Sequence, residues 1–255
     1  MKILLLGHKG YLGSYLLKHL STDVLLKRNV YNNGNKYSYI INCIGTPDLK
    51  TCKKYPEKTN YSNRDIVIDI KKYYPESKII NFSSYYVYDN NYNSIETSNV
   101  TKNNIYSRQK LEAEVINKDG INFRIGKLFG NPDINKQNKL TEYFLKNNNI
   151  EVDNITFNPT SVMQILDVIL YELKNNNLKG IYNLSNNNPT THYEYIKFID
   201  NYMGSKKDIK VVDKFHNFSN YGKFTMDCSK ITKYITLRCW KEDMIKYLSL
   251  IKEKV

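Results

Sequence analysis

Three glycines spaced as G-x-x-G-x-x-G lie at the start of the chain, directly after a short apolar run. The run covers residues 2–6, the glycines are Gly7, Gly10 and Gly13, and leucines then recur every four residues. This order predicts a strand, a tight turn and a helix. Glycine lets the backbone turn sharply and approach a pyrophosphate, whose charge then meets the N–H groups at the helix N-terminus. The opening segment therefore predicts the first unit of a dinucleotide-binding fold.

Short apolar runs alternate with helical patterns over the first half of the chain. The runs lie at residues 24–26, 39–41, 79–80 and 121–123, and the helical patterns at 57–73 and 104–118. Such alternation predicts an α/β fold with a Rossmann-type, doubly wound parallel sheet covered on both faces. The segment between Leu26 and Tyr39 is too short for a full helix, so we expect one crossover of larger Rossmann domains to be missing.

The pattern changes after Gly130. Helical stretches are expected at 137–147, 161–174 and 192–203 around a short strand at 181–184, and a last helix is expected from Trp240. We therefore predict two regions. Residues 1–130 form a dinucleotide-binding core that carries the catalytic residues, and residues 131–255 largely form a smaller C-terminal, substrate-binding lobe.

Charge and hydropathy narrow the class of protein. The 38 Lys and Arg residues exceed the 25 Asp and Glu residues by 13, but the basic residues are scattered and no nucleic-acid motif accompanies them. No window holds about 18 uninterrupted apolar residues, and the apolar run at residues 3–6 ends at Gly7 without the pattern of a signal-peptide cleavage site. We expect a cytoplasmic protein that binds neither nucleic acid nor membrane. The bias toward Lys, Asn, Tyr and Ile is typical of a very AT-rich genome, such as that of a large DNA virus or a protist parasite, and a virus would imply the host cytoplasm.

The four cysteines are far apart in the sequence. Cys43, Cys52, Cys228 and Cys239 include no Cys-x-x-Cys pair. This spacing argues for reduced thiols rather than disulfides or zinc, so we expect no metal site.

A basic pair follows the second predicted strand. In the Rossmann fingerprint an acidic residue at this place binds the ribose 2′-hydroxyl of NAD, whereas a basic residue accommodates the 2′-phosphate of NADP. Here the residues are Lys27 and Arg28. The chain is therefore expected to prefer NADPH over NADH.

Tyr106 and Lys110 form a Tyr-x-x-x-Lys pair on one helix face. A nearby ammonium stabilises phenolate and would lower a tyrosine pKa that is ordinarily about 10. Upstream, Ser84 lies at the end of a predicted strand and would deliver a hydroxyl to the same carbonyl. These three residues are the expected catalytic set.

With these motifs the chain resembles the extended short-chain dehydrogenases/reductases and, among them, the dTDP-4-dehydrorhamnose reductase (RmlD-like) family. The resemblance covers nearly the whole length. It is carried by the glycine turn, the Tyr106/Lys110 pair and the segments at 41–45, 83–89, 123–124, 129–130, 158–160, 180–185 and 226–230.

The resemblance implies reduction of a 4-keto-6-deoxy sugar nucleotide, UDP- or dTDP-linked, by hydride from NADPH in rhamnose-type or N-acetylamino-rhamnose-type synthesis. Ser84 would polarise the keto oxygen, Tyr106 would protonate it, and Lys110 would hold the nicotinamide ribose. Tyr86 and Lys127 are expected sugar contacts beside Ser84. Besides the basic pair, Tyr106 and Lys110, the expected cofactor contacts are Gly7, Lys9, Gly10, Tyr11, Leu12, Cys43, Ile44 and Gly45.

Several positions depart from the family pattern. Lys127 replaces an aromatic residue of the bacterial enzymes. In many bacterial members an acidic residue is tied to a magnesium-bound dimer, and it has no counterpart in residues 51–54, so no magnesium is expected. A homodimer remains a possible assembly. Related bifunctional 3,5-epimerase/4-reductases carry a cysteine where this chain has Tyr86, so we expect no epimerisation. His192 matches a helix start of the family and is interpreted as structural.

Two alternatives stay open besides the bifunctional enzyme. A non-catalytic regulatory subunit of methionine adenosyltransferase has the same dinucleotide fold, and the intact Ser84, Tyr106 and Lys110 favour the enzyme over it. A basic Rossmann protein that binds nucleic acid would show salt-dependent RNA retention.

Overall fold

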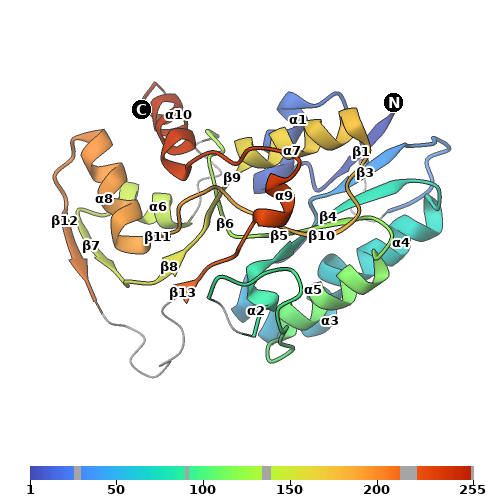
Figure 1. Ribbon diagram of the computed structural model, residues 1–255, viewed down its shortest axis with the longest axis horizontal. Helices are drawn as coiled ribbons and strands as arrows, with labels where there is room; N and C mark the ends of the chain where they lie inside the picture. Colours follow the sequence, from blue (N-terminus) through green and yellow to red (C-terminus); the bar gives the residue numbers. More distant parts are fainter. Residues whose placement is uncertain (26–29, 90–91, 134–138, 213–222, 254–255) are drawn as a thin grey trace. The chain divides into compact units, whose positions relative to one another are not determined.

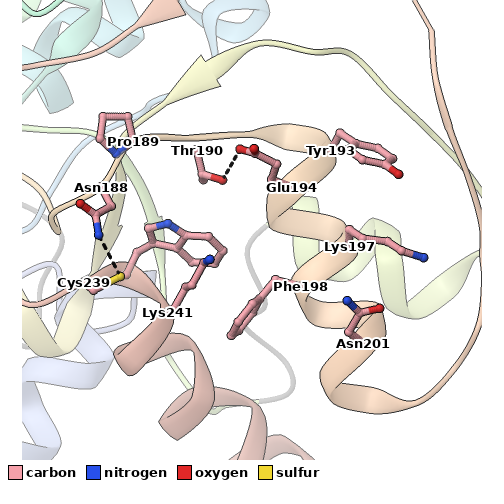
Figure 2. Close-up of a pocket in the computed structure, with 11 residues that line it drawn as sticks. Asn188, Pro189, Thr190, Tyr193, Glu194, Lys197, Phe198, Asn201, Cys239 and Lys241 are labelled. Carbon is pink, nitrogen blue, oxygen red and sulfur yellow. Dashed lines mark hydrogen bonds between the residues drawn. The ribbon is translucent and has the colours of Figure 1, made fainter.

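The computed structural model describes residues 1–25, 30–89, 92–133, 139–212 and 223–253. Within these residues the chain forms two compact units. The first unit takes its residues from 1–90, 96–125 and 172–183, and the second from 91–95, 126–171 and 184–255. Figure 1 traces the path of the chain through both. Each unit is described by itself.

The first unit is built on a six-stranded sheet with the strand order β10-β5-β4-β3-β1-β2. The pairs that join β2, β1, β3, β4 and β5 are all parallel. The strands are β1 (Ile3–Leu6), β2 (Asp23–Val24), β3 (Tyr39–Asn42), β4 (Lys78–Ser84), β5 (Ile121–Ile125) and β10 (Gly180–Leu184). The Rossmann-type α/β fold expected from the sequence is thus confirmed. The strand expected at 181–184 in the second lobe is instead the edge strand of this sheet.

Helices cover both faces of the sheet. Helix α1 (Tyr11–His19) lies on one face, and α4 (Ile66–Tyr73) and α5 (Ile105–Ile116) lie on the other (Figure 1). The core under α4 joins the strands to the helix through buried aliphatic side chains: Leu4, Ile40, Ile66, Val67 and Ile70. Leu12 and Leu16 of α1 are both buried, as their four-residue spacing predicts.

The helix expected at 57–73 is divided in the structure. It consists of α3 (Pro56–Asn60), a π-helix (Tyr61–Asp65) and α4, and α2 (Leu49–Lys54) precedes it. Asn63, within the π-helix, is buried and bonds to Thr46 and to the Gln109 side chain at 2.8 Å. The wide turn therefore coincides with an amide that is held from outside its own helix, a feature that apolar periodicity does not report.

A ladder of buried asparagines crosses the sheet. Asn42, Asn81 and Asn122 occupy the same register position in β3, β4 and β5. The Asn42 amide donates to Asn81 at 3.0 Å, and the Asn81 amide donates to Asn122 at 3.3 Å. Each side chain is at most 2% exposed, so these bonds replace the water that the amides give up.

The segment after β2 holds no helix within its described residues, 30–38, which agrees with the expected missing crossover. Tyrosines hold it instead. The Tyr37 hydroxyl donates to Asp23 at 3.0 Å and accepts from the Asn33 amide at 2.8 Å. The Tyr74 hydroxyl donates to the carbonyl of Tyr31 at 2.6 Å.

The second unit combines helices with three small sheets. Among its described residues the helices are α6 (Lys139–Lys146), most of α7 (Val162–Asn175), α8 (His192–Met203), α9 (Ser229–Thr232) and α10 (Trp240–Lys252), and the last four residues of α7 belong to the first unit. The strands are β6 (Lys127–Phe129), β7 (Asn149–Val152), β8 (Thr156–Phe157), β9 (Pro159–Ser161), β11 (Thr190–Thr191), β12 (Asp208–Val211) and β13 (Lys223–Phe224). They pair as β6-β9, β7-β12 and β11-β8-β13. The expected helices are present, whereas strands of two to four residues left no periodic signal.

Aromatic side chains form the core of this unit. Phe129, Phe157, Tyr195, Trp240 and Tyr247 are each at most 2% exposed. The rings of Tyr195 and Trp240 stack with centroids 5.4 Å apart, which joins α8 to α10. None of the helices within the described residues is long and apolar enough to cross a lipid bilayer.

Candidate active site

The glycine turn after β1 needs glycine for steric reasons. Gly7 has φ +75°, and a Cβ there would lie 2.7 Å from the carbonyl carbon of Cys43. A Cβ at Gly13 would lie 2.2 Å from the Gly7 carbonyl oxygen. The turn therefore packs directly against the end of β3 and against the first turn of α1, at distances that any side chain would block.

The start of α1 suits a dinucleotide pyrophosphate. Gly10 is the N-cap, no side chain caps the helix there, and its first turn holds no acidic residue. Such a helix end favours an anion, because N–H groups and the helix dipole point at it. Lys9 is exposed and Tyr11 half-buried, while the Leu12 side chain is buried in the core. Leu12 can thus contribute only its backbone to this site.

The end of β3 joins this turn to the expected catalytic lysine. The backbone N–H of Cys43 donates to Leu6 at 3.0 Å, and that of Ile44 donates to the Asn42 side chain at 3.1 Å. A Cβ at Gly45 would lie 3.3 Å from Nζ of Lys110. The structure therefore brings together two groups of residues that are more than sixty positions apart in the sequence. Burial raises the pKa of the Cys43 thiol, which stays protonated.

Ser84, Tyr106 and Lys110 are grouped as the sequence predicts. Ser84 ends β4, Tyr106 lies in the first turn of α5, and Lys110 lies one turn further on. Their exposed fractions are 5%, 6% and 6%. The Ser84 hydroxyl is close enough to the Tyr106 phenol to lower its pKa, against the larger effect of burial. A hydroxyl and a phenol thus converge where a carbonyl oxygen can accept from both.

The N-terminus of α5 fixes the position of the expected sugar contact Tyr86. Asn104 caps the helix by accepting from the Ser107 N–H at 2.8 Å. The Ser107 hydroxyl then donates to the Tyr86 carbonyl at 2.6 Å. The Tyr86 ring packs edge-on against Tyr106, with centroids 6.5 Å apart. Asn104 and Ser107 escaped the sequence analysis, although Asn before an amphipathic stretch is an N-cap signal.

The expected lowering of the Tyr106 pKa by Lys110 is not what the structure gives. Burial raises the pKa of Tyr106 to about 12, against the lowering effect of the Ser84 hydrogen bond. Burial also lowers the pKa of Lys110 to about 8, while Glu114 opposes that shift. Removal from water disfavours both charged forms, and this outweighs their mutual effect at a separation of 5.9 Å from Nζ to the ring centroid.

Lys127, the other expected sugar contact, belongs to the second unit and begins β6. Its Nζ lies 2.8 Å from Nε2 of His192, and His192 Nδ1 lies 2.5 Å from an Asp153 carboxylate oxygen. Sequence analysis did not connect these residues, because their contacts span 39 and 65 positions and no motif includes them. His192 is therefore part of a charged cluster as well as the first residue of α8.

Two expectations are not decided by the structure. Lys27 and Arg28 lie outside the described residues. Within the parts of the chain that are described, no group of three or more His, Cys, Asp or Glu side chains could hold a metal ion. The absence of magnesium stays a prediction.

The chain has the fold of known sugar-nucleotide enzymes. A dTDP-4-dehydrorhamnose reductase from Clostridium acetobutylicum matches with a TM-score of 0.83 and 20% identity, over 99% of this chain and 100% of that one. One from Yersinia enterocolitica gives 0.83 and 19%, over 98% and 99%. One from Bacillus anthracis, in complex with NADP, gives 0.82 and 17%, over 97% and 98%. No curated protein sequence matches the chain. The family model described as the RmlD substrate binding domain matches residues 1–252, and the chain belongs to this family, as its motifs predict.

Proposed function

We propose that this protein is an NADPH-dependent reductase of the 4-keto group of a UDP- or dTDP-linked 4-keto-6-deoxyhexose. The observation that carries the proposal is the convergence of Ser84 and Tyr106 at the end of β4, with Lys110 beside the glycine turn through Gly45. The fold likeness to a dTDP-4-dehydrorhamnose reductase in complex with NADP supports the cofactor. The start of α1, which no side chain caps and which holds no acidic residue in its first turn, fits a bound pyrophosphate.

The chemistry divides among three side chains. NADPH would supply the hydride to the carbonyl carbon. The Ser84 hydroxyl donates a hydrogen bond to the keto oxygen and stabilises the charge that develops there. Tyr106 passes its phenolic proton to the same oxygen, which completes the hydroxyl group. Because burial keeps the Tyr106 phenol protonated, the acid form needed for reduction is present at neutral pH.

The sugar contacts are part of the proposal. Tyr86 lies beside Tyr106 and turns an aromatic ring toward it. Lys127 lies two residues after Ile125 in the sequence. Ile125 in β5 pairs with Ser84 in β4. We assign substrate binding to Ser84, Tyr86 and Lys127, in a cytoplasmic protein that binds neither nucleic acid nor membrane. The proposal includes either uridine or thymidine as the base of the sugar nucleotide. It also includes a homodimer as the assembly.

A substrate screen tests this function. Purified protein is mixed with NADPH or NADH and with UDP- and dTDP-linked 4-keto-6-deoxy sugars, before and after C3/C5 epimerisation, and cofactor oxidation is followed by absorbance. We expect oxidation of NADPH with at least one of these sugars. A protein that binds NADPH but oxidises it with none of them would be a regulatory subunit rather than a reductase.

A further inference from the structure

Three titratable side chains from separate segments meet in the second unit. Lys127 begins β6, Asp153 follows β7, and His192 is the first residue of α8. The His192 ring lies between the other two, 2.8 Å from Nζ of Lys127 and 2.5 Å from Oδ1 of Asp153. We call these three residues the relay.

The hydrogen bonds of the relay determine which of its atoms carry a proton. An ammonium group only donates, so Lys127 requires an unprotonated Nε2 on His192. The single proton of the neutral imidazole is then on Nδ1, where it is donated to the Asp153 carboxylate. Transfer of a proton from lysine to histidine is unfavourable, because their ordinary pKa values differ by about four units. The relay therefore consists of a carboxylate, a neutral imidazole and an ammonium.

Packing holds the relay in one arrangement. The Phe157 ring is 2% exposed and lies 4.7 Å from the His192 ring, centroid to centroid, and 5.2 Å from Nζ of Lys127. The backbone N–H of His192 donates to the Ile155 carbonyl at 3.0 Å. The His192 and Asp153 side chains are 13% and 20% exposed, so the site is partly shielded from water.

The charges that bear on His192 come from both sides of the ring. Burial and the Lys127 charge lower the pKa of His192, while Asp153 opposes them. His192 and Lys127 together hold the pKa of Asp153 below its usual range, although burial opposes this. Phe157 brings no charge, and Glu194 on the same helix is held by hydrogen bonds at the helix cap. At neutral pH His192 is thus an acceptor for Lys127.

We propose that Asp153 and His192 are positioning residues that hold Lys127 as a substrate-binding ammonium, and that protonation of His192 releases it. An imidazolium would place an N–H donor against the ammonium 2.8 Å away, so the contact would be lost. This inference rests on the proposed function, in which Lys127 binds the sugar nucleotide. The recognised chemistry is an oxygen acceptor, either on the diphosphate or on the sugar.

The relay itself is tested without catalysis. Nitrogen-15 NMR of the histidine ring reports which nitrogen carries the proton, and the His192→Gln variant assigns the signal among the four histidines. We expect Nδ1–H at neutral pH. Lys127→Met removes a neighbouring positive charge and should raise the His192 pKa, while Asp153→Asn removes a negative charge and should lower it. An Nε2–H tautomer, or no shift in either variant, would overturn the relay.

Its role in binding is tested by calorimetry with UDP-glucose and dTDP-glucose, and with UDP and dTDP, from pH 5 to 8. Lys127→Met should raise Kd by about tenfold or more at pH 7.5, the loss of one charge-assisted hydrogen bond. If Lys127→Met weakens the binding of nucleotides and of sugar nucleotides equally, Lys127 contacts the diphosphate. If it weakens only the binding of the sugar nucleotides, Lys127 contacts the sugar. No weakening of either would refute substrate binding by Lys127.

Substitutions at His192 distinguish a role in positioning Lys127 from a role in the fold alone. In His192→Gln the amide oxygen can accept from Lys127 while the amide nitrogen donates to Asp153, and the side chain does not titrate. In the natural protein we expect Kd to rise as the pH falls below 6.5. In His192→Gln we expect Kd to be independent of pH, and in His192→Leu we expect it to be high at every pH. His19→Gln, in α1, is the matched control. If Gln is no better than Leu, or if the acid rise persists in it, His192 does not position Lys127. These binding results stand even if the sugar screen shows no reduction.

Discussion

Lys110 donates its Nζ hydrogen to the backbone carbonyl of Phe82, within β4, at 2.8 Å. The side chain is 6% exposed, and burial lowers its pKa from 10.5 to about 8. The protein therefore keeps a cation where hydration is poor. Such a position is costly for folding and useful for chemistry, since an ammonium there can hold a ribose next to the phenol of Tyr106.

Lys110→Met should stabilise the fold at neutral pH while it removes activity. The free energy of unfolding should rise by up to about 3 kcal/mol, because a shift of one pKa unit corresponds to about 1.4 kcal/mol. The folded state binds its proton less tightly than the unfolded chain. The penalty is therefore complete below pH 8 and fades as the pH rises toward 10.5. Urea unfolding at pH 7 and at pH 9.5 measures it.

The exposed Lys118, just past the same helix, provides the control. Lys118→Met should leave the unfolding free energy within about 0.5 kcal/mol at both pH values. A destabilised Lys110→Met protein at pH 7 would show that the Phe82 hydrogen bond outweighs the burial of the charge.

Tyr106→Phe should lower kcat by about 10² or more while the fold and NADPH binding persist. The ring still fills its buried position, and only the proton donor is lost. Stopped-flow absorbance with the best substrate of the screen gives kcat, and fluorescence titration gives the NADPH Kd. Tyr55→Phe, at an exposed tyrosine, serves as the matched change. Near-normal turnover in Tyr106→Phe would remove Tyr106 from the catalytic set.

The pH dependence of kcat/KM should follow Lys110 rather than Tyr106. This ratio reports ionisations of the free enzyme, where the pKa of Lys110 is about 8 and that of Tyr106 about 12. We expect kcat/KM to fall as the pH rises above 8, because the ammonium loses its proton. Lys110→Arg keeps its charge at these pH values, so whatever activity it has should lack this decline. A decline that persists in Lys110→Arg would assign it to another group.

Cofactor choice should depend on the basic pair after the second strand. The 2′-phosphate of NADPH offers a charge-assisted contact to Arg28, worth about 1.5 to 3 kcal/mol, that NADH lacks. The preference for NADPH should exceed tenfold, and Arg28→Ala should reduce it, with Lys27→Ala as the neighbouring comparison. An unchanged NADPH/NADH ratio of kcat/KM in both variants would mean that neither residue reads the phosphate.

Local patterns explain why much of the fold could be predicted from the sequence. The glycine turn, the apolar runs and the Tyr106/Lys110 spacing each depend on neighbours within a few residues, and the structure forms the corresponding strands and helices. The edge strand β10 was assigned to the wrong region, because strand pairing joins it to β5 across more than fifty residues. Periodicity contains no information on such pairing.

The residues of the site could be predicted from the sequence more completely than their pKa values. A helical i, i+4 spacing places Lys110 near Tyr106, but it does not report burial, which reverses the expected shift of the Tyr106 pKa. The relay is invisible for a related reason. Asp153, His192 and Lys127 are single polar residues in ordinary surroundings until three segments of the chain bring them together.

The residue two positions after Ser84 bears on a second reaction. Bifunctional relatives resemble this chain but have a cysteine there, which shuttles a proton at the carbon beside the ketone. Here the residue is Tyr86, and a phenol offers less of its anionic, proton-accepting form at neutral pH than a cysteine thiol does. Cys43 is no substitute, because burial raises the pKa of its thiol and keeps it protonated.

We therefore predict that the protein reduces a sugar already epimerised by a separate enzyme, and does not exchange protons at C3 or C5. The test supplies the unepimerised 4-keto sugar nucleotide in deuterated water without NADPH, so that reduction cannot remove the ketone, and follows the C3 and C5 protons by NMR. Tyr86→Cys, which introduces the thiol of the bifunctional relatives, is the matched variant and should exchange faster than the natural protein. Spontaneous exchange is measured in a sample without protein. Exchange above that background with the natural protein would show that it is bifunctional, and a loss of that exchange in Tyr86→Phe would identify the phenol as the base.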